Sequence, residues 1–318
     1  MPILNLVEKT VSSFCRTAVP LFYIISGYLF FLKVPDGVKS IIGKIRKRGR
    51  TLLVPYLIAN IFTFFFYCGV NAVALKFGGV ADVLNFKIFN DMDVLGVWGT
   101  LELVFINPPI AFQLWFVRDL MVMVLFSPLI WLILKWLVGL NHSVGKFLPI
   151  LFLAGLFAAG IWIGYVATAF WFMSGGYIAM SGITVGCTVR NKVLLYTVCI
   201  GYLFCLAVCV VGWSAELMGK CLPLLGVPAL WLVYDALSDH LSSVRIDWFA
   251  KYTFFVYLAH EPFLNIFKKI PLLISRSEMT FIISYLTIPI LFYVVACVVG
   301  ERFSRWFPNA YKIYTGGR

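Results

Sequence analysis

Residues Cys15–Lys33 read CRTAVPLFYIISGYLFFLK. The run is long and apolar enough for a helix that crosses about 30 Å of hydrocarbon, which takes roughly 20 residues. Its apolar residues are continuous and do not alternate, so the pattern is that of a membrane helix and excludes a barrel strand. Arg16 at its start, Pro20 in its first turn and Ser26-Gly27 in its middle are unusual residues for lipid and need an explanation.

The composition extends this interpretation to the whole chain. Of 318 residues, 62% are hydrophobic and 13% charged, and the mean hydropathy is +0.94, which leaves too little polar surface for a soluble domain. We expect spans at about residues 17–32, 51–70, 112–134, 147–164, 166–187, 193–212, 221–236, 249–267 and 279–299. With no repeat or linker, the sequence predicts an all-α polytopic membrane helical bundle of about nine transmembrane helices, as a single domain over residues 1–318.

Charge sets the expected topology. The net charge of +12 has no soluble basic domain to carry it, so nucleic acid is not an expected partner, and membrane lipid is. With the N-terminus outside, most of the 26 Lys and Arg residues fall inside, which places the C-terminus in the cytoplasm. The one long loop, roughly 71–111, then lies outside; it carries Asp82, Asp91, Asp93 and Glu102, and its stretch 94–105 is expected to lie along the interface.

The cysteines do not indicate a metal site or a disulfide framework. Most lie inside apolar runs, without a CxxC motif or a matching histidine cluster, so they are expected to be reduced hydrophobic residues. The first span also lacks the pattern of a cleaved signal, because basic residues flank both of its ends.

The densest positive charge lies in VKSIIGKIRKRGRTLLVPY, next to the second span. Its basic residues are Lys39, Lys44, Arg46, Lys47, Arg48 and Arg50. One interpretation is a topology signal in contact with lipid headgroups. The other is an electropositive mouth for a polyanionic cytoplasmic ligand, because guanidinium groups suit phosphate oxygens.

Arg118 and Asp119 are charged residues inside the third predicted span. Charges in a membrane helix are costly, and adjacent helical residues point about 100° apart. We therefore expect each to find a partner on another helix, either in a structural ion pair or in contact with substrate.

Tyr257, His260 and Glu261 stand at i, i+3 and i+4 in FVYLAHEPFL and are expected to share one helix face. Pro262 cannot donate to the carbonyl of Leu258 and should leave it free. Such a face is either a satisfied part of the core or, as is the default for ionisable residues inside a bilayer, a functional site.

Small residues recur in the fourth and fifth predicted spans. Gly160 and Gly164 form a GxxxG motif, followed by Gly175, Gly176 and Gly182. Close helix packing is the favoured interpretation, ahead of a ligand cradle.

In order along nearly the whole chain, CRTAVPLFYIISGYLFF, KRGRTLLVPYLI, LWFVRDL, WFMSGGYIAM, FVYLAHEPF and TGGR resemble the acyltransferase 3 family of integral-membrane O-acyltransferases. The resemblance implies a core of ten helices in the bacterial inner membrane, with acetyl-CoA or another acyl-CoA as donor and a glycan acceptor, a surface polysaccharide or its lipid-linked precursor. It matches Arg16 to the family's arginine before Val-Pro-Leu-Phe and places Trp115 beside Arg118 and Asp119. It makes Pro20 a helix start and Ser26-Gly27 a close approach of backbone.

One departure affects the expected mechanism. The family's first helix, which bears its catalytic histidine, precedes the Val-Pro-Leu-Phe helix, whereas this sequence begins shortly before it, so one helix is expected to be missing. The resemblance then leaves His260 as a supporting residue, oriented by Glu261 or Tyr257, and not as the base. The alternatives are a transporter or flippase for a glycan or small anion, and a truncated, non-catalytic family member.

The resemblance also assigns a role to the basic cluster. Arg46, Lys47, Arg48 and Arg50 are expected to bind the phosphates of coenzyme A. Without the resemblance, the topology signal remains an equal explanation.

Overall fold

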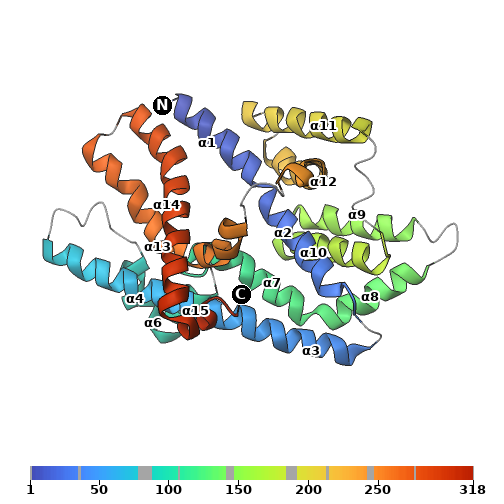
Figure 1. Ribbon diagram of the computed structural model, residues 1–318, viewed down its shortest axis with the longest axis horizontal. Coiled ribbons are helices and arrows are strands. Elements are labelled where there is room, and N and C mark those ends of the chain that lie inside the picture. Colours follow the sequence, from blue (N-terminus) through green and yellow to red (C-terminus); the bar gives the residue numbers. More distant parts are fainter. Residues whose placement is uncertain are drawn as a thin grey trace. The chain divides into compact units, whose positions relative to one another are not determined.

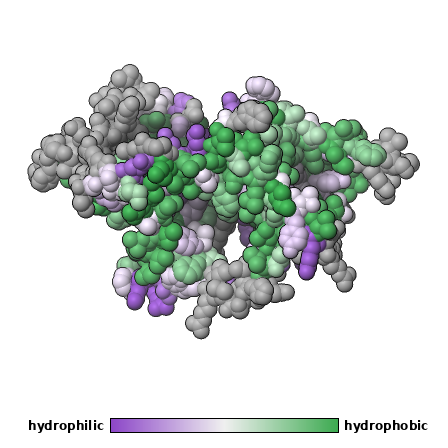
Figure 2. Space-filling model, turned by 90° about the horizontal axis from the view of Figure 1, so that it is seen from above, coloured by the Kyte–Doolittle hydropathy of each residue, from purple (hydrophilic) through white to green (hydrophobic). Residues whose placement is uncertain are grey.

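The computed structural model describes residues 2–34, 37–77, 88–106, 108–140, 147–183, 192–212, 215–241, 247–275 and 277–317. In these residues every regular element is a helix, and no strand occurs. The prediction of an all-α protein is confirmed. Hydrophobic side chains dominate the face shown in Figure 2, as expected of a protein that lies in a bilayer.

The chain forms two compact units. We call Lys47–Met121 with Arg245–Arg318 the α4–α14 unit, and Pro2–Arg46 with Val122–Val244 the α2–α12 unit. The prediction of a single domain stays a prediction.

The α4–α14 unit contains a π-helical turn, a short 3-10 helix and six helices or parts of helices (Figure 1). They are η1 (Gly49–Leu53), α4 (Val54–Phe77), α6 (Ile88–Phe105), η2 (Phe112–Leu114), the first part of α7 (Trp115–Leu125), α13 (Asp247–Ile274), α14 (Glu278–Trp306) and α15 (Pro308–Tyr314).

The α2–α12 unit is built from eight helices (Figure 1). They are α1 (Pro2–Cys15), α2 (Ala18–Phe31), most of α3 (Val38–Arg48), α8 (Ser127–Gly139), α9 (Leu148–Gly160), α10 (Gly164–Met180), α11 (Lys192–Val211) and α12 (Ala215–Leu241). Helix α1 was not predicted, and it packs against α11.

Five segments of the described chain are long and apolar enough to cross a membrane. They are Ile3–Phe31, Val38–Val70, Lys192–Val211, Glu216–Leu237 and Glu278–Trp306. A sixth forms if the pair Phe112–Leu125 and Ser127–Gly139 counts as one bent span. The multi-pass prediction is confirmed, while the predicted spans 147–164 and 166–187 appear as the shorter helices α9 and α10, and residues 184–187 lie outside the described chain.

Two predicted spans are interrupted where proline occurs. The span 112–134 bends by 65° between α7 and α8, next to Pro128. The span 249–267 lies in α13, whose backbone leaves the helical conformation at Glu261, just before Pro262. In both cases proline has no N–H for the helical hydrogen bond, and its ring displaces the preceding turn.

Close backbone packing explains the small residues of α2 and α10. A Cβ on Gly27 would overlap the Phe172 carbonyl, and one on Gly175 would overlap the Ile24 carbonyl. The two helices therefore approach at glycines from both sides, as the Ser26-Gly27 pair predicted.

Of the other glycines predicted to pack closely, some lie against neighbouring residues and some do not. Gly160 contacts the backbone of Ala167, and Gly176 contacts the Phe31 and Leu134 side chains. Among the described residues nothing lies near a Cβ added at Gly164 or Gly182, so the packing prediction holds for three of the five glycines.

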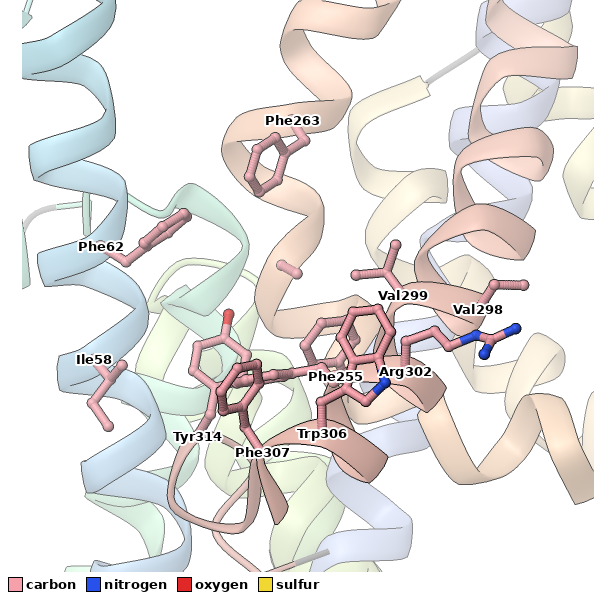
Figure 3. Close-up of a pocket in the computed structure, with 12 residues that line it drawn as sticks. Ile58, Phe62, Phe255, Phe263, Val298, Val299, Arg302, Trp306, Phe307 and Tyr314 are labelled. Atoms are coloured by element: carbon pink, nitrogen blue, oxygen red, sulfur yellow. The ribbon is translucent and has the colours of Figure 1, made fainter. Parts of the chain in front are cut away.

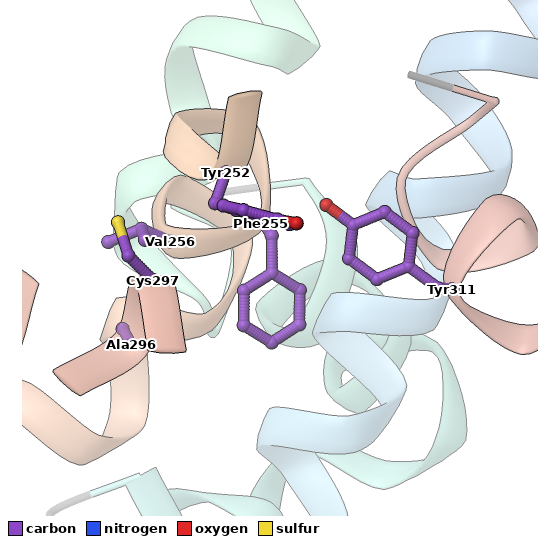
Figure 4. Packing of buried hydrophobic residues seen from close by; sticks show 6 residues of the cluster. All are labelled: Tyr252, Phe255, Val256, Ala296, Cys297 and Tyr311. Atoms are coloured by element: carbon purple, nitrogen blue, oxygen red, sulfur yellow. The ribbon is translucent and has the colours of Figure 1, made fainter. Parts of the chain in front are cut away.

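The core of the α4–α14 unit joins α13, α14 and α15 (Figure 4). The rings of Phe255 and Tyr311 stack with centroids 5.8 Å apart, and Cys297 on α14 is fully buried beside them. Burial, with Tyr252 nearby, raises the pKa of Tyr311 to about 12, and burial raises the pKa of Tyr314 above its usual value. Both phenols therefore stay neutral at physiological pH.

Candidate functional site

Helix α4 carries a polar stripe within its apolar sequence. Tyr56, Asn60, Thr63 and Tyr67 are spaced by four, three and four residues, so they lie on one helix face. All four are at most 4% exposed. Sequence reasoning missed this stripe, although its spacing in the predicted span 51–70 was the available signal.

The stripe holds an irregular segment of backbone. The Tyr56 hydroxyl donates to the Phe105 carbonyl, and Asn60 Oδ1 accepts from the Ala111 N–H at 3.2 Å. Phe105 and Ala111 therefore lie alongside α4, within the predicted span 51–70, where these two side chains satisfy backbone groups that lipid could not. That 71–111 lies outside the membrane stays a prediction, although Phe105 and Ala111 of this stretch contact α4; residues 78–87, with Asp82, lie outside the described chain.

Arg118 and Asp119 pair with each other. The Arg118 guanidinium lies 2.8 Å from Asp119 Oδ1, and it also donates to the Ile106 carbonyl. The expectation that Asp119 needs a partner on another helix is wrong, because the long, flexible arginine side chain folds back onto its neighbour although their Cβ atoms diverge. Trp115, half-buried, lies one turn before Asp119 on α7.

Helix α13 reaches the same segment of backbone. The Tyr257 hydroxyl donates to the Gln113 carbonyl at 2.6 Å, and Gln113 Nε2 donates to the Leu258 carbonyl at 3.4 Å. Leu258 is four residues before Pro262, so the carbonyl that the sequence predicted to be free is the one that Gln113 contacts.

His260 has a defined ring orientation. Its Nδ1 lies 2.9 Å from the Tyr257 carbonyl. A carbonyl can only accept, so this contact requires the proton on Nδ1 and leaves the lone pair on Nε2. The half-buried imidazole thus presents its basic nitrogen away from its own helical turn.

Glu261 does not share the face of His260, because the helix breaks at this residue. Its carboxylate instead accepts from the Tyr67 hydroxyl at 2.9 Å and from the Asn265 amide. The proline that follows explains the break, which turns the carboxylate towards α4.

These contacts define a polar interior in the α4–α14 unit. Its members are Tyr56, Asn60, Thr63, Tyr67, Gln113, Arg118, Asp119, Tyr257, His260 and Glu261. Most of their polar groups bond to protein. Within the described residues, Thr63 Oγ1 and Gln113 Oε1 are buried without a hydrogen-bond partner.

Arg16 belongs to the other unit. It lies in the turn between α1 and α2, and its guanidinium packs so tightly on α12 that a Cβ on Gly219 would overlap it. An alanine at position 219 would therefore displace the end of the Arg16 side chain from this place.

The basic residues of the cluster have different surroundings: Lys44 bonds to backbone, whereas most of the others are exposed. Lys44 Nζ donates to the Phe30 and Leu32 carbonyls at 2.6 and 3.0 Å, so it caps the end of α2. Lys39 lies in the first turn of α3, and the other four lie at the end of α3 and in η1, with Arg48 half-buried and Arg46, Lys47 and Arg50 exposed. Within the described chain, none of these four pairs with a carboxylate.

The model of the family described as an acyltransferase domain, acyltransferase 3, matches residues 2–300. The chain belongs to the acyltransferase 3 family. The match includes every residue of the polar interior and most of both units, and it ends before the last residues of the α4–α14 unit. Among curated proteins no match to the chain is found, and none is found among solved structures. Membership makes the chain a membrane acyltransferase in general terms.

Proposed function

We propose that this acyltransferase moves an acetyl group from acetyl-CoA to a sugar hydroxyl of a bacterial cell-surface polysaccharide or its lipid-linked precursor, in the inner membrane. The observation that carries the proposal is the orientation of His260, whose Nδ1 is held by the Tyr257 carbonyl. Acyl transfer to a hydroxyl needs a base with a pKa near neutrality, and an imidazole with a free Nε2 is suited to this.

In the proposed reaction, His260 Nε2 takes the proton of the sugar hydroxyl as its oxygen attacks the thioester carbonyl. The new C–O bond forms, the C–S bond breaks, and the imidazolium returns the proton to the coenzyme A thiolate. The products are the acetyl ester and free coenzyme A, and no further reactant is needed. This gives His260 a more direct role than the supporting one expected from the sequence.

Two buried groups of the polar interior that have no hydrogen-bond partner within the described residues are assigned to a hydroxylated acceptor. Thr63 Oγ1 can donate and accept, and Gln113 Oε1 accepts, so together they match the hydroxyl groups of a sugar. Gln113 is also tied to Tyr257 on α13, which relates this acceptor subsite to the turn that orients the imidazole.

Two replacements of His260 test the base. An asparagine amide can keep the donor to the Tyr257 carbonyl but has no basic nitrogen, whereas alanine loses both. Transfer of labelled acetyl from acetyl-CoA to native envelope glycan in vesicles should fall by about 10²–10⁴-fold in both variants. Wild-type transfer by His260→Asn would show that the histidine is only structural and would remove it from the reaction.

The coenzyme A phosphates are assigned to Arg46, Lys47, Arg48 and Arg50. Replacing the three arginines with glutamine should raise the apparent KM for acetyl-CoA and leave the orientation of a C-terminal tag unchanged. An unchanged KM with inverted orientation would favour the topology signal. Counterflow of glycan without acetyl transfer would indicate a transporter, and protection by acetyl-CoA without turnover a non-catalytic protein.

A further inference from the structure

A groove of about 620 Å³ runs along the α4–α14 unit between α4, α13, α14 and α15 (Figure 3). Its volume lies in the range of small-molecule sites. The lining is almost wholly apolar, and Arg302 on α14 lies at its edge with the guanidinium directed past Val298 (Figure 3).

The groove opens at the surface. Val299 is 51% exposed and Trp306 is 68% exposed, while Phe255 at its base is 7% exposed. In Figure 3, Arg302 extends beside Val298 on the α14 side, and Phe62 approaches from α4. A chain that entered from the side would therefore meet rings below it and α4 on the far wall.

The groove has its polar residues at the C-terminal end of α14 and apolar residues further along the helix. Arg302 and Trp306 lie in the last two turns of the candidate span Glu278–Trp306, where tryptophan and arginine mark the boundary between hydrocarbon and headgroups. From there the lining continues through Val298 towards Phe263 and is apolar. The arrangement matches an amphiphile with its head at the helix end and its chain inside.

The positive charge of Arg302 indicates that the polar head of the bound amphiphile is anionic. The neighbouring Glu301 pairs with Arg305 at 2.6 Å, one turn further on. Within the described residues no carboxylate pairs with Arg302, so a positive charge at the rim of the groove is open to an anion.

We propose that this groove is a binding site for one anionic phospholipid, with its phosphodiester on Arg302 and an acyl chain between α4, α13 and α14. Ala259 and Phe263 line the groove on either side of the helix break at Glu261, so the bound chain also supports the wall that carries His260. The site is independent of which acyl group or acceptor the protein uses.

The test is native mass spectrometry of the delipidated, full-length protein titrated with palmitoyl-oleoyl phosphatidylglycerol or the matching phosphatidylcholine. Arg302→Gln should weaken the first phosphatidylglycerol binding step about fivefold and abolish the preference over phosphatidylcholine. Arg305→Gln, which removes the same charge one turn away and outside the groove lining, should leave both unchanged. Equal losses in the two variants would overturn the headgroup assignment.

A second variant tests the chain. Val299→Trp fills the groove from an exposed position, so folding is preserved, and binding of both lipids at this step should fall. Undiminished phosphatidylglycerol binding would overturn the groove as its location. Tighter binding of palmitoyl-coenzyme A than of phosphatidylglycerol would also overturn the proposal, because the groove would then serve the donor.

Discussion

The hydrogen bond between Asn60 and the Ala111 N–H is expected to hold the irregular segment in place. Both residues are fully buried, so Asn60→Ala leaves that N–H without a partner and without water. An unsatisfied buried donor costs about 1–3 kcal/mol. The truncation also leaves a small cavity, which needs its own control.

Thr63 supplies that control one turn along the same face. It is equally buried, yet within the described chain its hydroxyl has no partner, so Thr63→Ala removes volume without a hydrogen bond. Thr63→Val keeps the volume and should leave stability unchanged or raise it, because a buried hydroxyl without a partner is itself unfavourable. The difference between Asn60→Ala and Thr63→Ala reports the hydrogen bonds of Asn60, which also donates from Nδ2 to the Tyr56 carbonyl at 2.9 Å.

The free energy of unfolding can be followed by fluorescence and circular dichroism in mixed micelles with increasing SDS. Hydrogen exchange of the peptide covering residues 105–114 gives the local readout and should rise in Asn60→Ala alone. If Asn60→Ala is no more destabilising than Thr63→Ala and its exchange is unchanged, the segment is not held by α4, and the polar interior as described is incorrect.

The same unfolding assay tests two further sites. Gly27→Ala should cost about 1–3 kcal/mol because its methyl group would force α2 from α10, whereas Gly155→Ala, which faces open space on α9, should stabilise its helix by up to about 1 kcal/mol. Lys44→Met should cost about 1 kcal/mol, because the last carbonyls of α2 lose their cap. Gly219→Ala should displace only the flexible end of Arg16, so acetyl transfer should fall while stability changes by less than about 1 kcal/mol; unchanged transfer would show that the placement of Arg16 is not needed.

The fold class was predictable because it depends on properties that a single sequence displays. Continuous apolar runs show spans, and glycine in such runs shows close helix packing, as at Gly27 and Gly175. Proline shows which carbonyl loses its helical partner, so the free carbonyl of Leu258 followed from Pro262 alone. Each of these inferences uses residues within one continuous stretch of sequence.

The irregular segment was not predictable in that way. Its position depends on Asn60 and Ala111, which are far apart in sequence, and on a polar stripe that looks unremarkable residue by residue in a predicted span. The prediction for Arg118 and Asp119 was wrong for a local reason. It used the directions of the Cβ atoms and ignored the reach of the arginine side chain.

The polar interior contains two kinds of polar group, and this distinction bears on function. Polar groups inside a bilayer are unfavourable unless they are satisfied, and the groups of Tyr56, Asn60 and Tyr67 bond to protein atoms, so structure alone accounts for them. It does not account for Thr63 Oγ1, which is buried without a hydrogen-bond partner in the described chain, or for the basic nitrogen of His260. Groups of the first kind should change stability when replaced. Groups of the second kind should change transfer while stability is maintained, which separates the scaffold of this acyltransferase from the chemistry we propose for it.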